Sequence, residues 1–102
     1  MTPKDRKLAV LNRVFAGETM SHACQAEGHG RHSGYPWMFR GQEAEILDRL
    51  AAGQTLPKGA LRAWIRYQRT AALVADMRSG ARSVEDTIRA LRSLRAMPYR
   101  PN

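Results

Sequence analysis

The sequence contains little of several residues on which other classes of protein depend. Its 102 residues include one cysteine, so no disulfide can form within the chain and the fold must rest on packing. No apolar run approaches the roughly 18–20 residues that span a bilayer, and the basic N-terminus is not followed by the apolar stretch of a secretory signal. These absences predict a cytoplasmic protein with no membrane partner.

Motifs of enzymes and cofactor sites are also missing. The sequence shows no carboxylate pair, phosphate-cradling glycine loop or metalloprotease motif. His22, Cys24, His29 and His32 lie within eleven residues, but their spacing matches no standard zinc module, and a lone thiol on a helix is usually buried. We therefore expect no enzymatic activity, no metal site and no cofactor.

Acidic residues are scarce relative to basic ones. The chain has 17 Lys and Arg against 9 Asp and Glu, a net charge of +8. Residues 1–53 hold seven basic and six acidic groups, whereas residues 54–102 hold ten basic and three acidic groups. This excess favours a polyanionic partner, with nucleic acid first and an acidic protein surface second.

Signals for helices are strong, and signals for strands are nearly absent. Apolar residues recur at helical spacing between capping residues and glycines, and 43% of the residues are apolar, as in globular domains. The expected helices are about 3–16, 20–27, 34–40, 43–52, 56 or 57 to 78, and 84–97. The prediction is an all-α fold of four to six short helices joined by consecutive αα-corners.

Particular residues mark the ends of these helices. Thr2 is expected to cap the first, Gly17 to end it, Thr55 to cap the long helix that ends at Arg78, and Ser83 to cap the last. Cys24, Trp37 and Trp64 are expected in the core, and Val84, Ile88 and Leu91 are expected to face inward.

An internal similarity runs through two of the corners. Residues 10–20 match residues 46–56 at an offset of 36, with five of eleven positions identical, including Leu11 with Leu47 and Arg13 with Arg49. Either an internal duplication or the shared residue preferences of any helix–Gly–cap–helix corner explains the match. We expect one helical domain over residues 1–102, with a helix-turn-helix-like unit at 1–41, arginine-rich helices at 42–97 and a tail at 98–102.

The first of these segments carries a motif of its own. It consists of Arg6-Lys7, Gly17-Glu18-Thr19, Ala23-Cys24, Glu27-Gly28 and Tyr35-Pro36-Trp37-Met38-Phe39-Arg40. With these residues, positions 6–40 resemble the helix-turn-helix of insertion-element transposases and of the related Trp-repressor-like and small bacterial cell-cycle regulators. In that family the third helix enters the major groove and basic residues flank the phosphates.

The resemblance implies roles for individual positions. Four side chains would lie at the base-contacting edge, namely Arg31, His32, Ser33 and Tyr35. Trp37 would pack in the three-helix core, and Arg40 would touch the DNA backbone.

Two rows of arginines follow in the second half. Arg62, Arg66 and Arg69 form one row, and Arg89, Arg92 and Arg95 form the other, at spacings of three and four that place guanidinium groups along a helix face. In a segment with so few acids, we expect these rows to contact phosphates or an acidic partner.

The sequence therefore predicts a small non-enzymatic protein that binds double-stranded DNA, a bacterial or phage transcriptional regulator, nucleoid-associated or phage-encoded. A homodimer is expected, because a two-fold DNA site doubles the contact surface of one small domain. The alternative is a protein-binding module, such as a phage inhibitor or adaptor, whose basic helical face docks on an acidic partner.

Overall fold

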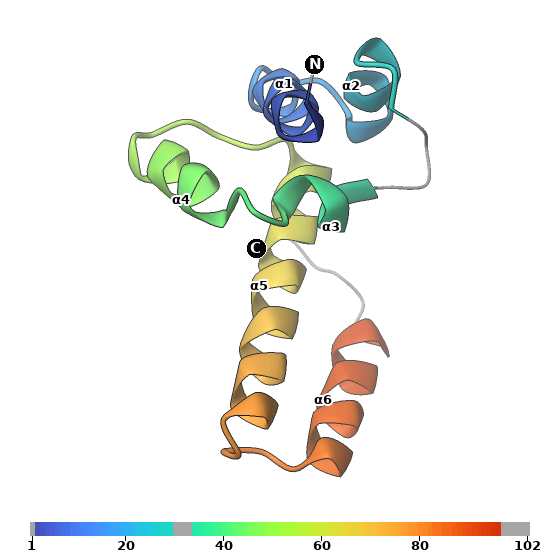
Figure 1. Cartoon of the computed structure of the whole chain (residues 1–102), viewed down its shortest axis with the longest axis vertical. Helices are drawn as coiled ribbons and strands as arrows, with labels where there is room; N and C mark the ends of the chain where they lie inside the picture. Colours follow the sequence, from blue (N-terminus) through green and yellow to red (C-terminus); the bar gives the residue numbers. More distant parts are fainter. Residues whose placement is uncertain (1, 30–33, 97–102) are drawn as a thin grey trace. The chain divides into compact units, whose positions relative to one another are not determined.

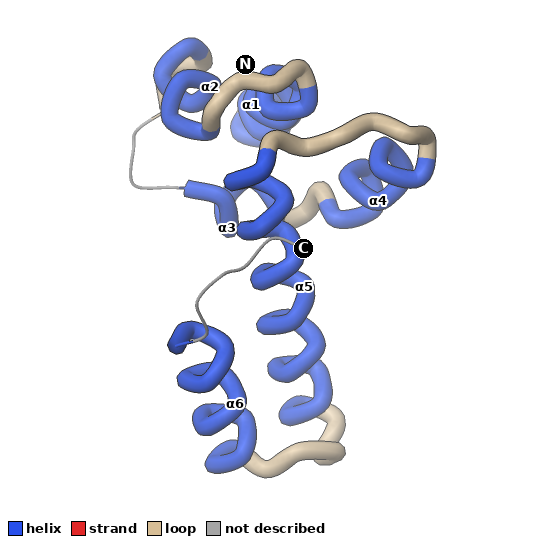
Figure 2. Tube along the Cα trace, turned by 180° about the vertical axis from the view of Figure 1, so that it is seen from behind, coloured by secondary structure: helices blue, strands red, loops and turns tan. Residues whose placement is uncertain are grey.

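A computed structural model describes residues 2–29 and 34–96, with the side chains of 34, 95 and 96 excepted. The described residues form six helices and no strand (Figure 1, Figure 2). In chain order they are α1 (Pro3–Phe15), α2 (Met20–Ala26), α3 (Gly34–Phe39), α4 (Glu43–Ala51), α5 (Lys58–Arg78) and α6 (Val84–Ala96). The predicted all-α fold of four to six helices is confirmed.

The chain divides into two compact units, residues 1–64 and residues 65–102, so that α5 begins in one unit and ends in the other. The sequence placed its internal boundary after Gly41, 23 residues earlier. The difference has a physical reason in the packing of Phe39 against Trp64, whose ring centroids lie 5.2 Å apart in an edge-to-face arrangement. The first turns of α5 are thereby part of the N-terminal core.

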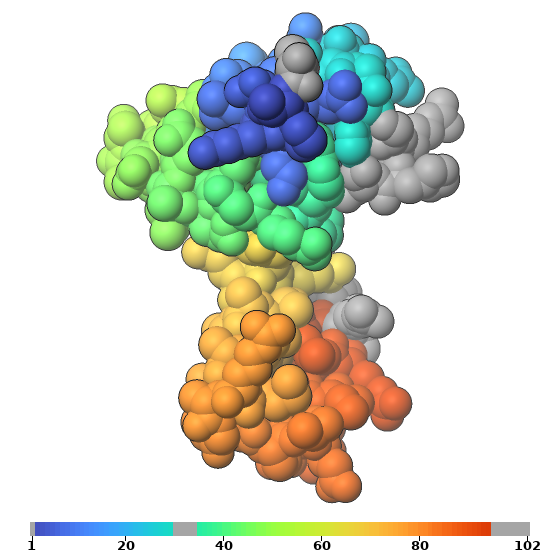
Figure 3. Space-filling model, viewed as in Figure 1, coloured from blue at the N-terminus to red at the C-terminus, as the bar shows by residue number. Residues whose placement is uncertain are grey.

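The first unit contains the hydrophobic core. Helices α1, α2 and α3 pack against one another, and Figure 3 shows the blue, cyan and green side chains of this unit forming one continuous packed surface. Every buried apolar side chain of the described residues lies here: Val10, Leu11, Val14, Met20, Ala23, Cys24, Met38, Phe39, Ile46, Leu56, Ala60 and Trp64. The predictions for Cys24 and Trp64 are confirmed, whereas Trp37 is only half-buried.

Side-chain caps begin three of the helices. Thr2 and Asp5 form a capping box at α1, in which the Asp5 backbone N–H donates to Thr2 Oγ1 and the Thr2 backbone N–H donates to the Asp5 carboxylate. Thr19 Oγ1 accepts from the backbone N–H of His22 at α2, and Ser83 Oγ accepts from that of Asp86 at α6. The predicted caps at Thr2 and Ser83 are confirmed.

Four helices end at a glycine with the same backbone geometry. The glycines that follow α1, α2, α4 and α5 all have positive φ, at Gly17, Gly28, Gly53 and Gly80. Each donates its N–H to the carbonyl three residues back, and the residue after it donates to the carbonyl five residues back. This pair of bonds satisfies the last carbonyls of the helix, and the left-handed glycine that it needs explains why the sequence marks these ends so clearly.

The internal similarity acquires a structural explanation from these corners. Arg13 donates to the Glu18 carboxylate across the Gly17 turn, and Arg49 donates to Gln54 Oε1 across the Gly53 turn. The matched arginines therefore brace matched corners, five residues ahead in both cases. Since α2 and α5 end in the same backbone motif without belonging to the similarity, shared corner chemistry accounts for much of the match.

The start of α5 differs from the prediction. The helix begins at Lys58, and Thr55 is exposed before it and does not cap it. Proline disfavours helical backbone at the residue before it, which explains why Leu56 lies outside the helix. The Pro57 carbonyl accepts the first helical bond, from the N–H of Leu61 at 2.9 Å.

The inward face of α6 also differs from the prediction. Val84 and Ile88 are 60% and 44% exposed, so they do not face inward. The buried position belongs to Thr87, which is 2% exposed and donates its hydroxyl to the Ser83 carbonyl at 2.8 Å. A threonine can be buried at this position because the preceding turn satisfies its hydroxyl.

Candidate nucleic-acid interface

The residues that the helix-turn-helix resemblance places at the base-contacting edge lie around the start of α3. Arg31, His32 and Ser33 fall outside the described residues. Tyr35 is half-buried, with its ring stacked on Phe39 at 5.8 Å between centroids. Burial raises the pKa of its phenol, and a hydrogen bond with the backbone of Met20 opposes that shift. Tyr35 thus ties α3 to α2, and only part of its ring is open to a ligand.

A stacked pair of rings flanks this edge. The imidazole of His29 lies 3.8 Å from the indole of Trp37, with an angle of 13° between the planes, and Lys7 Nζ lies 5.6 Å from the same indole. His29 Nε2 is buried and has no hydrogen-bond partner among the described residues. Across all the residues that the structure describes, no three His, Cys, Asp or Glu side chains lie close enough together to hold a metal ion.

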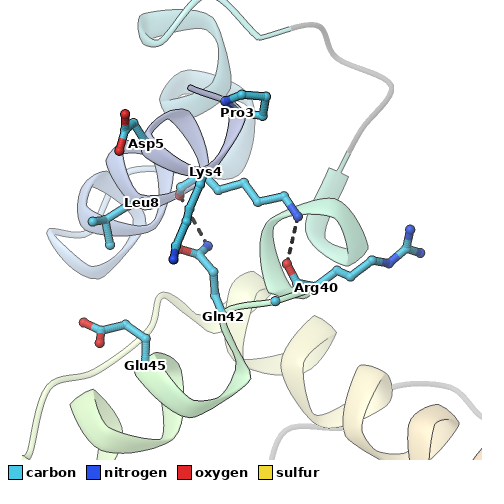
Figure 4. A pocket seen from close by; sticks show the side chains of 9 residues that line it. Pro3, Lys4, Asp5, Leu8, Arg40, Gln42 and Glu45 are labelled. Carbon is cyan, nitrogen blue, oxygen red and sulfur yellow. Dashed lines mark hydrogen bonds between the residues drawn. The ribbon is translucent and has the colours of Figure 1, made fainter. Parts of the chain in front are cut away.

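Arg40 lies at the end of α3, beside a shallow hollow of about 480 Å³ between the start of α1 and the turn into α4. Its guanidinium is exposed, while its backbone carbonyl accepts a 2.8 Å hydrogen bond from Lys7 Nζ. Gln42 also lines the hollow and donates to the carbonyls of Met38 and Lys7. Figure 4 shows Arg40 and Glu45 on opposite sides of it.

The charges around this hollow nearly balance. Its lining includes the cations Lys4, Lys7 and Arg40 and the carboxylates Asp5 and Glu45. One N–H of the Lys7 ammonium is already bound to a carbonyl, which fixes the position of this charge, and the two carboxylates offset most of the charge of the three cations. The hollow therefore gives little attraction for a polyanion.

Other cations of the first unit are engaged in holding the fold. Arg13 bridges Glu27 at 2.9 Å and Glu18 at 3.2 Å, and these two carboxylates raise the pKa of its guanidinium. Arg49 donates to Asn12 Oδ1 at 2.7 Å and lies 4.2 Å from the ring of Phe15, so it joins α4 to α1. Neither arginine is available to a ligand without loss of these contacts.

The described arginines of the second unit are mostly exposed and make few contacts with carboxylates. Its sequence holds eight arginines against three acids, and the described side chains of Arg66, Arg69, Arg78, Arg89 and Arg92 are all exposed. Its described residues form a single ion pair, a 3.8 Å contact between Arg89 and Asp86 that is largely open to water. Such a pair contributes little to stability, so the guanidinium groups remain available.

The predicted row of Arg62, Arg66 and Arg69 is divided by the boundary between the units. Arg62 belongs to the first unit and is partly buried, whereas Arg66 and Arg69 belong to the second and are exposed. Sequence reasoning passed over Arg78, which is exposed in the last turn of α5. It included Lys7 in the motif of residues 6–40 but not the hydrogen bond of Lys7 to the Arg40 carbonyl. The sequence did contain a signal for Arg78, because no acidic residue lies three or four positions from it, where it could pair with the arginine on a helix.

Comparisons with known proteins give no relative: no family model, no curated protein and no solved structure matches this chain. No helix in the described ranges combines the length and the apolar character that crossing a membrane requires.

Proposed function

We propose that the protein binds double-stranded DNA and carries out no chemistry on it, with the arginines of the second unit as its main contacts. One observation carries the proposal. Arg66, Arg69 and Arg78 are exposed, and no carboxylate of the described residues lies within 4.0 Å of any of them. A surface that keeps this much unpaired positive charge stabilises a complex with a polyanion more than it stabilises the free protein.

The type of cation agrees with phosphate as the ligand. All of the basic residues after Lys58 are arginines, and guanidinium groups bind phosphate oxygens through two parallel hydrogen bonds. Three such contacts would release the counterions of about three phosphates. The logarithm of the affinity should then fall with the logarithm of the salt concentration with a slope of about −3.

The first unit would add base contacts. In the helix-turn-helix to which residues 6–40 are similar, the third helix supplies them, but α3 has only six residues, and its Met38 and Phe39 are fully buried. Few side chains of α3 are thus free to meet a groove. We infer that phosphate contacts supply most of the affinity and that specificity is modest, with Arg31, His32 and Ser33 as its source. A small bacterial or phage transcriptional regulator fits this division of roles.

The experiment is a salt series of binding to a fluorescently labelled 30-base-pair duplex, read by anisotropy between about 50 and 300 mM KCl. The test variant is R66Q/R69Q. Its matched control is K4Q/K58Q, which removes the same charge from two exposed positions of the first unit. We expect the test variant to bind at least about tenfold more weakly, with a salt slope reduced by about two, and the control to change much less.

Two outcomes would overturn the proposal. The first is no binding by the wild-type protein at about 50 mM salt and micromolar concentration. In that case, retention of a protein partner from nuclease-treated lysate would support the alternative function, in which the basic face docks on an acidic protein surface. The second is an equal loss in both variants, because net charge alone would then explain the affinity.

A further inference from the structure

The described residues of the second unit form no hydrophobic core of their own. In its described part, α5 from residue 65 onward and α6 form an antiparallel hairpin (Figure 1, Figure 2), and the one fully buried side chain is Thr87. Its larger apolar residues, such as Leu73, Val74 and Leu91, are only half-buried. Two helices that bury so little apolar surface are marginal in water, so a further surface is needed to cover them.

The uncovered apolar surface is concentrated on one edge of α6. Val84, Ile88 and Leu91 follow one another at spacings of four and three, which places them in line along the helix. Five large hydrophobic residues of the described chain are exposed, and Val84 and Ile88 are the pair among them that shares a helix face. The others, Leu8, Leu47 and Leu61, lie on three different helices. We call the line of Val84, Ile88 and Leu91 the α6 edge.

Charge along α6 indicates what covers this edge. The first turn carries Glu85 and Asp86, and the later turns carry Arg89 and Arg92. Asp86 contacts Arg89 within its own helix, whereas Glu85 has no ion pair among the described residues. Glu85 and Arg92 are seven residues apart, about 10 Å along the helix axis, and they form no ion pair with each other within the chain. In an antiparallel second copy of α6, the acidic start of one helix faces the basic end of the other.

We propose that a second copy of this chain covers the α6 edge, with the two α6 helices antiparallel about a two-fold axis. If the axis passes between residues 89 and 90, Ile88 of each copy lies opposite Leu91 of the other. Glu85 then lies about 3 Å along the axis from Arg92 of the partner, within reach of an ion pair. A two-fold interface forms each of these contacts twice and joins two hairpins into a four-helix bundle. This inference does not depend on DNA binding.

The experiment is sedimentation velocity of the full chain, without DNA, at concentrations from about 2 to 300 µM, the range in which small interfaces associate. We expect the 11.5 kDa monomer to convert to a dimer as the concentration rises. The variant I88Q should weaken the dimer at least about tenfold, because it puts an amide in the apolar centre of the interface. L47Q is the control, since Leu47 is 49% exposed against 44% for Ile88 and lies on α4 of the other unit.

A charge exchange tests the orientation. E85R and R92E should each weaken the dimer, because each places like charges opposite one another, and the double variant E85R/R92E should recover it. Recovery of the dimer would come from the pair between two chains, since the two residues form no ion pair within one. A wild-type chain that stays monomeric at 300 µM would overturn the proposal and leave the edge to a different protein. Equal weakening by L47Q and I88Q, or no recovery in the double variant, would also overturn it.

Discussion

At the residue scale, the capping box of α1 links the start of that helix to the ionisation of one carboxyl. Hydrogen bonds from Thr2, first from its side chain and then from its backbone, hold the pKa of Asp5 below its ordinary value. A depressed pKa means that folding favours the ionised form. The contribution to stability is therefore complete above the unfolded pKa of about 3.9 and is lost as the pH falls through the lower folded pKa.

Thr2→Val tests this link. The substitution keeps the shape of the side chain and removes the hydroxyl, so the pKa of Asp5 should rise toward its ordinary value and α1 should fray at its start. An NMR titration of the Asp5 carboxyl carbon measures the shift. Thr55→Val is the matched control, because Thr55 is exposed and caps no helix. An Asp5 pKa that stays low in the Thr2 variant would show that the hydroxyl is not its cause.

Residues of the candidate interface illustrate how a side chain can leave the binding surface for the fold. Tyr35 and Lys7 both have the chemistry for nucleic-acid contact, an aromatic ring and an ammonium. The ring of Tyr35 stacks on Phe39, and the ammonium of Lys7 binds the Arg40 carbonyl. Among the described positions near α3, this leaves the exposed guanidinium of Arg40 as the one best placed for a phosphate.

At the element scale, the glycines that end helices differ from the glycine inside one. Gly53 has φ +92° and nothing within 4 Å of an added Cβ, so Gly53→Ala meets no steric clash but strains the backbone. Gly59, in the first turn of α5, has ordinary helical backbone, and an added Cβ would meet Tyr35 Oη at 3.6 Å, an ordinary contact.

These two positions predict opposite effects of one substitution. Gly53→Ala should lower the free energy of unfolding by about 1 kcal/mol. Gly59→Ala should raise it by up to about 1 kcal/mol, because alanine has the higher helix propensity. Urea denaturation of both variants beside the wild type gives the comparison. A stabilised Gly53→Ala would contradict the left-handed corner after α4.

Helix ends could be predicted from the sequence because they depend on neighbouring residues. Thr2, Ser83 and the corner glycines act within a few positions of themselves, and local preference is enough to locate them. The start of α5 was missed by one or two residues although Pro57 gave the needed signal. Both arginine rows were visible as spacing, because helical periodicity is also a local property.

Features that depend on contacts between distant residues were not predictable. Periodicity shows that α6 has an apolar stripe, but it does not show which residue of the helix is buried. In the structure Thr87 is buried and Ile88 is exposed. The pairing of Phe39 with Trp64 joins residues 25 positions apart, and no local pattern announces it. The resulting boundary within α5 separates Arg62 from Arg66 and Arg69. Which of these arginines share a unit therefore depends on a contact that no local pattern shows.

At the scale of the whole molecule, stability is unequally distributed. The buried apolar side chains of the described residues all lie before residue 65, whereas the hairpin buries none completely. Regions with few buried contacts open more readily than the core does. Amide hydrogen exchange should therefore be slowest in α1 and α2 and faster by at least about tenfold in α6 at low micromolar protein.

Concentration should change this pattern in the hairpin alone. If a second copy covers the α6 edge, exchange in α6 slows as the protein concentration rises, while exchange in α1 stays the same. Exchange measured by mass spectrometry at about 5 and 200 µM makes the comparison. Protection of α6 equal to that of α1 at the lower concentration would contradict the unequal distribution of stability.

The placement of the two tryptophans gives the chain a built-in optical reporter. Trp37 and Trp64 are the only tryptophans in the sequence, and both lie in the first unit. Trp64 is buried against Phe39, so its emission should shift to the red when that core opens. Fluorescence then reports the unfolding of residues 1–64, whereas circular dichroism at 222 nm also records the helices of the hairpin. In a denaturant titration, the distance between the two midpoints measures how far the halves of α5 unfold independently.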